Sequence, residues 1–219
     1  MLALSDTCRA ALSGQGGLCG CLTPAGLGRL RAVAGDARLE AGEVLFRRGD
    51  AALHLYGVRH GAMMLSRVLD GKRRQVLSFH FAGDMLGFAG DDPHQATATA
   101  LGRVGLCRIP LARIGDDAAL AGQVLAVLQA NVVRAQERLL LLGRMSAAER
   151  VAAALVELWR RLGGGPELHL PMRLVDLADY LGLRPETVSR EMALLRRRGL
   201  IGPLSPEGVL PVLAPEALA

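Results

Sequence analysis

The chain has 219 residues, of which 51% are hydrophobic, 21% are charged and only 3% are aromatic. This length allows one large domain or two small ones, and the apolar content excludes disorder over most of the chain. No stretch approaches the roughly 18 uncharged apolar residues that a transmembrane helix needs, so no membrane partner is expected. The first residues lack the basic and apolar segments of a signal peptide, which predicts a cytoplasmic protein with reduced cysteines.

The formal net charge of +5 is unevenly distributed along the chain. Residues 1–146 hold 17 Lys and Arg against 12 Asp and Glu, whereas residues 147–219 hold nine of each sign. A basic chain favours a nucleic-acid partner, but the C-terminal third is neutral. Evidence for DNA binding by that third must therefore come from local pattern.

Short apolar runs broken by glycine characterise residues 36–110. Turn residues separate the runs, among them 48–50 (Arg-Gly-Asp) and the Asp-Gly pair at 70–71, which is a strong hairpin signal. Regularly spaced short strands of this kind are typical of a β-barrel or jelly roll. We therefore predict a jelly-roll sensor domain over residues 24–117, preceded by a cysteine-containing segment over residues 1–23.

Residues 118–145 contain no proline and predict one long helix with two apolar stripes. The shorter stripe, Leu120, Val124 and Val127, is suited to packing on the jelly roll of the same chain. The longer stripe has the heptad spacing of a helix that pairs with a second helix. Heptads this short also occur in cores, but two stripes on one helix favour a homodimer. The predicted dimer seam consists of Leu125, Leu128, Val132, Ala135, Leu139 and Leu142.

Residues 146–219 predict a compact, mainly helical domain. Ser146 and Glu149 have the spacing of a capping box, which opens an apolar helix through Trp159. The glycines and proline that follow end this helix, and residues 167–170 are expected to form a short strand. The overall fold class is therefore α+β.

Two short helices joined by a tight turn follow in the same domain. The first runs through residues 174–180, Gly182 makes the turn, and Pro185 occupies a first-turn position that tolerates it. This pattern predicts a helix-turn-helix, whose second helix can enter the major groove of DNA. A hairpin formed by residues 199–203 and 208–213 would complete a winged domain. The buried stripe of the second helix is expected to be Val188, Met192 and Leu195.

Glu186, Ser189 and Arg190 share the opposite face of the second helix. Arginine can donate two hydrogen bonds to guanine, glutamate can accept one from cytosine, and serine can serve either kind of edge. We therefore expect these three to read bases. The alternative is a solvated Glu–Arg pair on a helical hairpin. Residues 184–198 carry five Arg against two Glu, and the expected phosphate contacts are Arg184, Arg196, Arg197 and Arg198.

With these motifs in this order, the chain resembles the CRP/FNR superfamily of bacterial transcription regulators over nearly its full length. Residues 42–50 and 81–87 resemble that family's cyclic-nucleotide-binding-like jelly roll, and residues 147–153 resemble the start of its DNA-binding domain. Residues 181–190 resemble the Glu-x-x-Ser-Arg recognition helix of the FNR/FixK branch. The resemblance implies a homodimer that reads a TTGAT…ATCAA-type inverted repeat and recruits RNA polymerase. Arg184 departs from the threonine usual at its position.

Cyclic AMP is not expected to bind the jelly roll. Family members that bind it hold the phosphate with an Arg-Ser pair, and residues 88–100, the corresponding stretch, contain no Arg. Asp91 and Asp92 would repel a phosphate at close range.

An iron–sulfur cluster is the second sensor that the resemblance suggests. Cys8, Cys19 and Cys107 match three of the four cysteines of the oxygen-sensing branch. Ala11 stands where the second of that branch's cysteines would be, and Cys21 is a candidate replacement for it. Four thiolates would suit a [4Fe–4S] cluster, although Cys-x-Cys spacing is unusual for one. The alternative is a degenerate site of ordinary thiols.

Ala135 bears on the same question, because oxygen-sensing members tend to carry an acidic residue in the seam. An uncharged seam favours a constitutive or weakly regulated dimer of the FixK type. No catalytic set of residues is recognisable, so no enzyme activity is expected. A regulatory module whose winged helix binds protein is the other alternative, and the base-reading face at 186–190 argues against it.

Overall fold

The structure is a computed structural model that describes residues 28, 33–69, 73–89, 92–115 and 118–218. These residues form two compact units. The first contains the described residues up to Arg67 and those of Leu77–Val133, and the second contains those of Val68–Val76 and from Arg134 onward. Across the described ranges, no helix combines the length and the apolar composition that crossing a bilayer requires.

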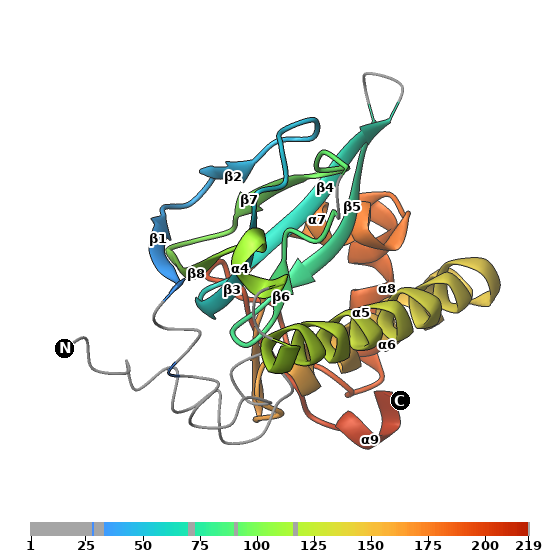
Figure 1. The fold of residues 1–219 in the computed structure, drawn as a ribbon. Helices are drawn as coiled ribbons and strands as arrows, with labels where there is room; N and C mark the ends of the chain where they lie inside the picture. Colours follow the sequence, from blue (N-terminus) through green and yellow to red (C-terminus); the bar gives the residue numbers. More distant parts are fainter. Residues whose placement is uncertain (1–27, 29–32, 70–72, 90–91, 116–117, 219) are drawn as a thin grey trace. The chain divides into compact units, whose positions relative to one another are not determined.

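Two four-stranded sheets build the jelly roll, which confirms the predicted β domain (Figure 1). One sheet has the strand order β1-β8-β3-β6 and the other β2-β7-β4-β5. Non-consecutive strands are neighbours in both, which is the mark of a sandwich with crossing connections. The strands are β1 (Gly35–Leu39), β2 (Val44–Phe46), β3 (His54–His60), β4 (Met63–Leu69), β5 (Arg73–His80), β6 (Met85–Leu86), β7 (Thr97–Ala100) and β8 (Val104–Pro110).

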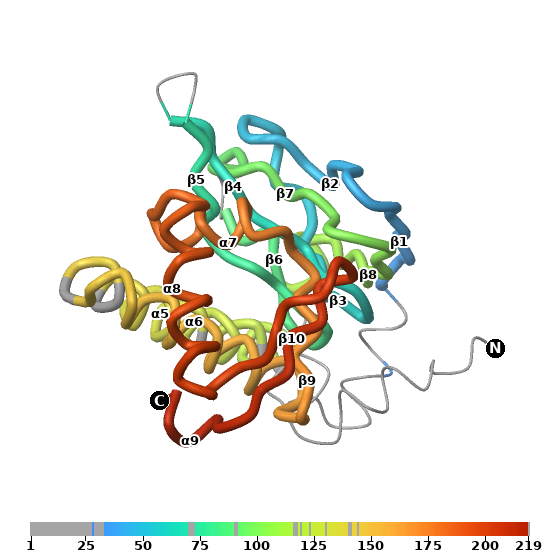
Figure 2. The backbone as a smooth tube through the Cα atoms, turned by 180° about the vertical axis from the view of Figure 1, so that it is seen from behind, coloured from blue at the N-terminus to red at the C-terminus, as the bar shows by residue number. Residues whose placement is uncertain are grey.

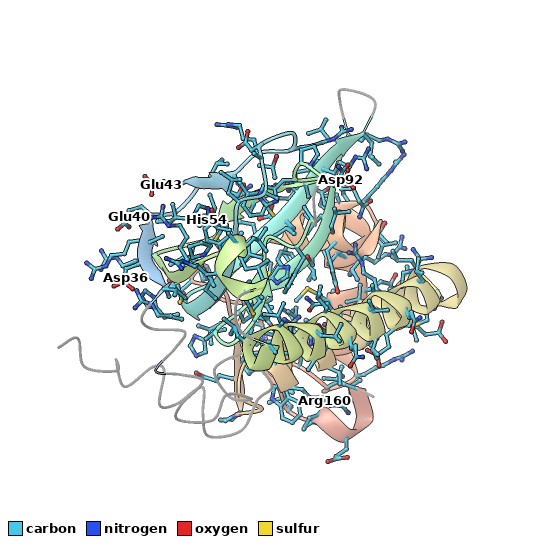
Figure 3. The ribbon with its side chains drawn as sticks, in the orientation of Figure 1. Asp36, Glu40, Glu43, His54, Asp92 and Arg160 are labelled. Carbon is cyan, nitrogen blue, oxygen red and sulfur yellow. The ribbon has the colours of Figure 1, made fainter. Side chains whose placement is uncertain are left out.

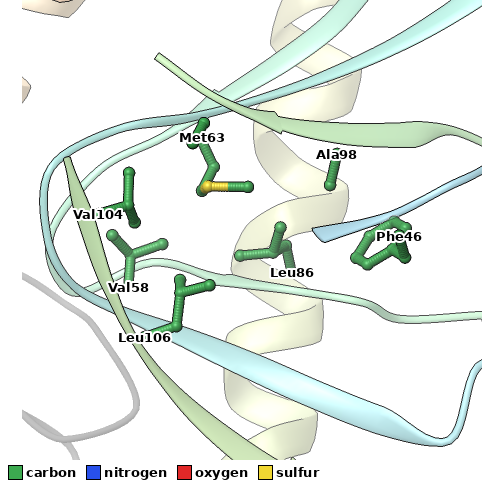
Figure 4. Packing of buried hydrophobic residues seen from close by; sticks show 8 residues of the cluster. Phe46, Val58, Met63, Leu86, Ala98, Val104 and Leu106 are labelled. Carbon is green, nitrogen blue, oxygen red and sulfur yellow. The ribbon is translucent and has the colours of Figure 1, made fainter. Parts of the chain in front are cut away.

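The core of the first unit lies between the two sheets (Figure 4). Alternation along a strand sends every second side chain inward, as in β7, where Ala98 and Ala100 are buried and the two threonines of the strand, Thr97 and Thr99, are only half-buried. Strands of both sheets contribute to one apolar cluster, and burial of this cluster stabilises the packing of the two sheets on each other. Its members are Phe46, Val58, Met63, Leu86, Ala98, Ala100, Val104 and Leu106.

The long helix α5 (Ala118–Arg144) follows the short helix α4 (Leu111–Gly115). Leu120, Val124 and Val127 are buried in a second apolar cluster, which confirms that the shorter stripe packs on the jelly roll. Their spacing places them on one side of α5. Their partners in this cluster are Leu55, Met85, Ile109 and Ile114.

Acidic side chains gather around β1 and the turn that follows it (Figure 3). Asp36 forms an ion pair with Arg59, with an N–O distance of 3.0 Å, and Glu40 forms one with Arg103 at 3.4 Å. The carboxylate of Glu43 accepts a hydrogen bond from the backbone N–H of Glu40. Part of the positive charge of the first unit is therefore neutralised by neighbouring carboxylates.

The second unit is mainly helical, and its first full helix begins where the sequence predicts. Ser146 Oγ accepts from the backbone N–H of Glu149, and the Glu149 carboxylate accepts from the backbone N–H of Ser146 at 2.7 Å. The predicted capping box is thus present. The elements are α6 (Ala147–Arg161), β9 (Glu167–His169), α7 (Leu174–Leu181), α8 (Pro185–Arg197), β10 (Val209–Pro211) and α9 (Pro215–Leu218).

The predicted hairpin between residues 199–203 and 208–213 is present, because Gly202 donates its N–H to the carbonyl of Pro211 and Leu213 donates its N–H to that of Leu200. An antiparallel bridge joins Ile201 to Val212 in this hairpin, and β10 pairs in addition with β9, which the sequence does not predict (Figure 2).

A buried carboxylate anchors the start of α7. Asp176 accepts hydrogen bonds from the backbone N–H and Nε of Arg173, at 3.2 and 3.3 Å, and from Nη2 of Arg74 at 2.5 Å. Arg74 also donates through Nε to Asp179 at 2.8 Å. Burial by itself would raise the pKa of Asp176, but the two arginines outweigh it and hold this pKa below its usual value.

Replacing Asp176 by Asn is expected to lower the stability of the second unit by about 1.5–3 kcal/mol at neutral pH, because charge-assisted hydrogen bonds are lost. The native pKa lies below the unfolded one, so the carboxylate stabilises the fold above the unfolded pKa and stops doing so as the pH falls through the native pKa. Urea unfolding from about pH 7 to about pH 3 should therefore show the two proteins converging. The exposed Glu216→Gln serves as control. A difference between D176N and the parent that stayed constant over this range would contradict the assignment.

Candidate nucleic-acid interface

The helix-turn-helix is built from α7, a glycine turn and α8, and the two helices pack on each other. Gly182 ends α7 in the left-handed region, with φ +63°, where a side chain would be strained. Leu183 donates its N–H to the carbonyl of Ala178, which closes the turn. Pro185 is the first residue of α8, as predicted, because its missing N–H has no helical partner there.

One face of α8 is buried and fixes the rotation of the helix. Val188, Met192 and Leu195 are all buried, in agreement with the predicted stripe. Glu186, Ser189 and Arg190 lie on the other side and are exposed. The structure thus brings the three predicted base-reading side chains together on one accessible surface.

The predicted phosphate contacts stand at the two ends of the same helix. Arg184 is exposed at the N-cap of α8. At the other end Arg196 and Arg197 occupy the last turn and Arg198 the C-cap, and all three are exposed. The C-terminal arginines also complement the negative end of the helix dipole. Positive charge therefore brackets the exposed face of α8.

An interaction that the sequence analysis missed lies on this helix. Arg190 Nε and Nη2 both donate to Oε1 of Glu191, at 3.3 and 3.2 Å. The alternative to base reading that the sequence offers is a solvated pair of Arg190 with Glu186 instead. Glu191 is buried beside the apolar stripe, and its residue type at that position was the available signal, because buried carboxylates are rare without a partner.

The predicted dimer seam is only partly covered by the rest of the chain. The side chains of Leu125, Val132 and Leu139, one heptad position repeated, are 56%, 55% and 71% exposed. At the other heptad position Ala135 is exposed, and Leu128 and Leu142 are half-buried. The predicted seam is thus more exposed to solvent than the stripe formed by Leu120, Val124 and Val127 on the same helix.

Of the four candidate metal ligands, only Cys107 falls within the described residues; Cys8, Cys19 and Cys21 lie outside them. Cys107 is half-buried on β8 and packs against the apolar cluster that receives α5. Within the described ranges, no three His, Cys, Asp or Glu side chains gather as a metal site would require.

The loop that leads into β7 offers no cation to a cyclic phosphate, since residues 88–100 contain neither Arg nor Lys. His94 is buried there, with its ring stacked on Phe46 at a centroid distance of 3.6 Å. Burial lowers the pKa of His94 and so favours its neutral form. Asp92 is exposed, and Asp91 lies outside the described residues.

Two known protein families match the chain, one in its N-terminal part and one in its C-terminal part. Residues 37–116 match the cyclic nucleotide-binding domain family, and residues 149–219 match the Crp-like helix-turn-helix domain family. The nitrogen fixation regulation protein FixK of Rhizobium meliloti is 39% identical over 182 residues, which covers 83% of this chain and 84% of FixK. The transcriptional activatory protein AadR of Rhodopseudomonas palustris is 36% identical over 204 residues, covering 88% and 83%.

The solved structure of FixK2 from Bradyrhizobium japonicum aligns with a TM-score of 0.80 at 30% identity, and covers 85% of this chain and 96% of that one. The fold, the helix-turn-helix and these relatives agree on one assignment. The chain belongs to the CRP/FNR superfamily, whose members bind DNA and dimerise, and it is a DNA-binding transcription regulator of the FixK/FNR type.

Proposed function

We propose that this regulator binds a TTGAT…ATCAA-type inverted repeat as a homodimer, with α8 of each protomer in a major groove. The exposed face formed by Glu186, Ser189 and Arg190 carries the proposal. Its donors and acceptors suit base edges, with Arg190 able to donate to O6 and N7 of the guanine in each half-site. A two-fold dimer would present two such helices to two half-sites.

The arginines at the ends of α8 complete the proposed interface. Arg184 would contact a phosphate at the helix start, and Arg196, Arg197 and Arg198 would contact phosphates at its end. Such contacts hold a recognition helix in register without reading sequence. In this proposal residues 24–117 form the sensor-like domain, 118–145 the dimerisation helix and 146–219 the DNA-binding domain.

Arg190→Ala is expected to reduce discrimination between the inverted repeat and a repeat with its guanines replaced by adenines. The loss of the bidentate contact should cost about 1–3 kcal/mol, or roughly 5- to 160-fold, in this ratio for each half-site. Fluorescence anisotropy with both duplexes at one salt concentration measures it. Arg160→Ala, an exposed arginine on α6, is the matched control. An unchanged ratio in R190A would remove Arg190 from the base-reading set.

The exposed heptad positions of α5 support dimerisation through this helix. Leu125, Val132 and Leu139 recur every seven residues, and large apolar side chains in such a row are covered by a second helix in coiled coils. The shorter stripe already faces the jelly roll. The second stripe is therefore available for the same helix of a second protomer.

A carboxylate in this seam is expected to separate the protomers. Leu139→Glu would place two charges near the two-fold axis, where burying them is costly. Size-exclusion chromatography with light scattering should show a monomer at micromolar concentration, whereas Ala126→Glu, on the outer side of α5, should stay dimeric. A dimeric L139E would mean that the protomers associate through another surface.

We propose further that the dimer forms independently of the cysteines, as in the FixK-type alternative. The uncharged Ala135 supports this, since the seam then contains no carboxylate to be offset by a cofactor. Cys107 packs against an apolar cluster, and among the described residues no three His, Cys, Asp or Glu side chains gather as a metal site would require. The other three candidate cysteines lie outside the described residues, and the proposed mechanism uses no cluster.

A variant with Ser at all four cysteine positions should therefore remain dimeric and bind the inverted repeat with the affinity of the parent, in air and under nitrogen. The anaerobically purified parent should be colourless, with four titratable thiols. Visible absorption with bound iron and sulfide, together with loss of DNA binding in the Ser variant, would instead indicate oxygen sensing through a cluster.

We also propose that the DNA-bound dimer activates transcription in the cytoplasm by recruiting RNA polymerase. Relatives named as transcriptional activators support the direction of regulation, among them FnrA of Stutzerimonas stutzeri, 32% identical over 173 residues. The relatives are transcription regulators, and this function involves no enzymatic step of the protein's own.

A further inference from the structure

We propose that Glu191 is a specificity-determining residue, which positions the Arg190 guanidinium for guanine. The proposal rests on the proposed function, in which Arg190 reads that base. Glu191 is one of four buried polar or charged side chains among the described residues. A carboxylate at the edge of the apolar stripe of α8 is costly unless a cation pairs with it.

The pair uses one edge of the arginine fork. Both Nε and Nη2 of Arg190 donate to Oε1 of Glu191. The other edge of the planar guanidinium is formed by an N–H of Nη1 and the second N–H of Nη2, and these two N–H groups are not used in the pair with Glu191. That edge presents two parallel N–H groups, which match O6 and N7 of guanine. Glu191 can therefore hold Arg190 while Arg190 binds a base.

The difference in exposure makes Glu191 the fixed partner. The Glu191 side chain is 9% exposed and packed in the domain, whereas that of Arg190 is 68% exposed. A free arginine side chain loses much rotamer freedom when it binds, and a carboxylate that already restricts it reduces this loss. Glu191 thus acts through Arg190 on the choice of base, with no need to touch DNA.

The effect on base choice can be separated from the effect on overall affinity. A carboxylate near the DNA repels phosphates, so its removal should strengthen binding to every sequence. Only the ratio between a guanine and a modified guanine at the same position reports the positioning of Arg190. In 7-deazaguanine, a C–H group replaces the N7 acceptor, and the rest of the base pair is retained.

The test compares Glu191→Leu with Glu191→Gln, each as the full-length dimer, on the inverted repeat and on the same repeat with 7-deazaguanine. Leu keeps the volume and suits a buried site but removes the acceptor, whereas Gln keeps an oxygen that Arg190 can bond. We expect E191L to lower the affinity ratio between the two duplexes by about two- to tenfold, the cost of ordering one long side chain. E191Q should restore most of it, and Glu216→Gln controls for the loss of one negative charge.

Arg190→Ala and the double variant R190A/E191L complete the cycle. In the R190A background, E191L should leave the ratio unchanged, because Glu191 then has no arginine to position. If R190A abolishes discrimination while E191L retains it in full, the positioning role is overturned and the proposed function stands. If R190A itself retains discrimination, the proposed base reading by Arg190 is overturned. Circular dichroism melting curves confirm that each variant folds.

Discussion

The buried stripe of α8 is the constraint on which the DNA-binding surface depends. Val188, Met192 and Leu195 must face the domain core, since exposing them would forfeit apolar burial of about 1.5–3 kcal/mol each. With 3.6 residues per turn, this requirement fixes the rotation of the helix. The direction of every other side chain of α8 follows from this rotation, and the side chains on the outer side are those to which the proposed function assigns the base contacts.

The same constraint applied to α5 divides that helix between two tasks. Burial of Leu120, Val124 and Val127 against the jelly roll uses one side of the helix. Leu125, Val132 and Leu139 are turned away from that side and remain exposed. In an isolated protomer, three large apolar side chains in one row would favour aggregation, and a symmetric partner removes this cost. The proposed dimer interface on α5 is thus the side that the packing of this helix within its own chain leaves exposed.

Local periodicity was enough to predict α5, the capping box of α6 and the glycine turn before α8, because each depends on residues within a few positions. The pairings that the sequence does not predict depend on contacts that no local spacing pattern signals. Asp176 is anchored by Arg74, about a hundred residues earlier in the chain, and no local pattern connects them. β10 pairs with β9 across two helices. Arg190 and Glu191 are adjacent, a spacing at which helical side chains do not normally meet; only the length of arginine allows it.

Where the positive charge lies matters more than its amount. The excess of +5 belongs to residues 1–146, and there Asp36 and Glu40 already pair with Arg59 and Arg103. The DNA-binding domain is neutral, and five of its nine arginines lie in residues 184–198. A uniformly basic domain would bind any duplex through counterion release, which raises non-specific affinity as much as specific affinity. A balanced net charge with a local cluster of arginines at one helix favours fewer non-specific phosphate contacts than a uniformly basic surface. The ratio of specific to non-specific binding, on which recognition within a genome depends, is therefore better served by this neutral domain than by a high isoelectric point.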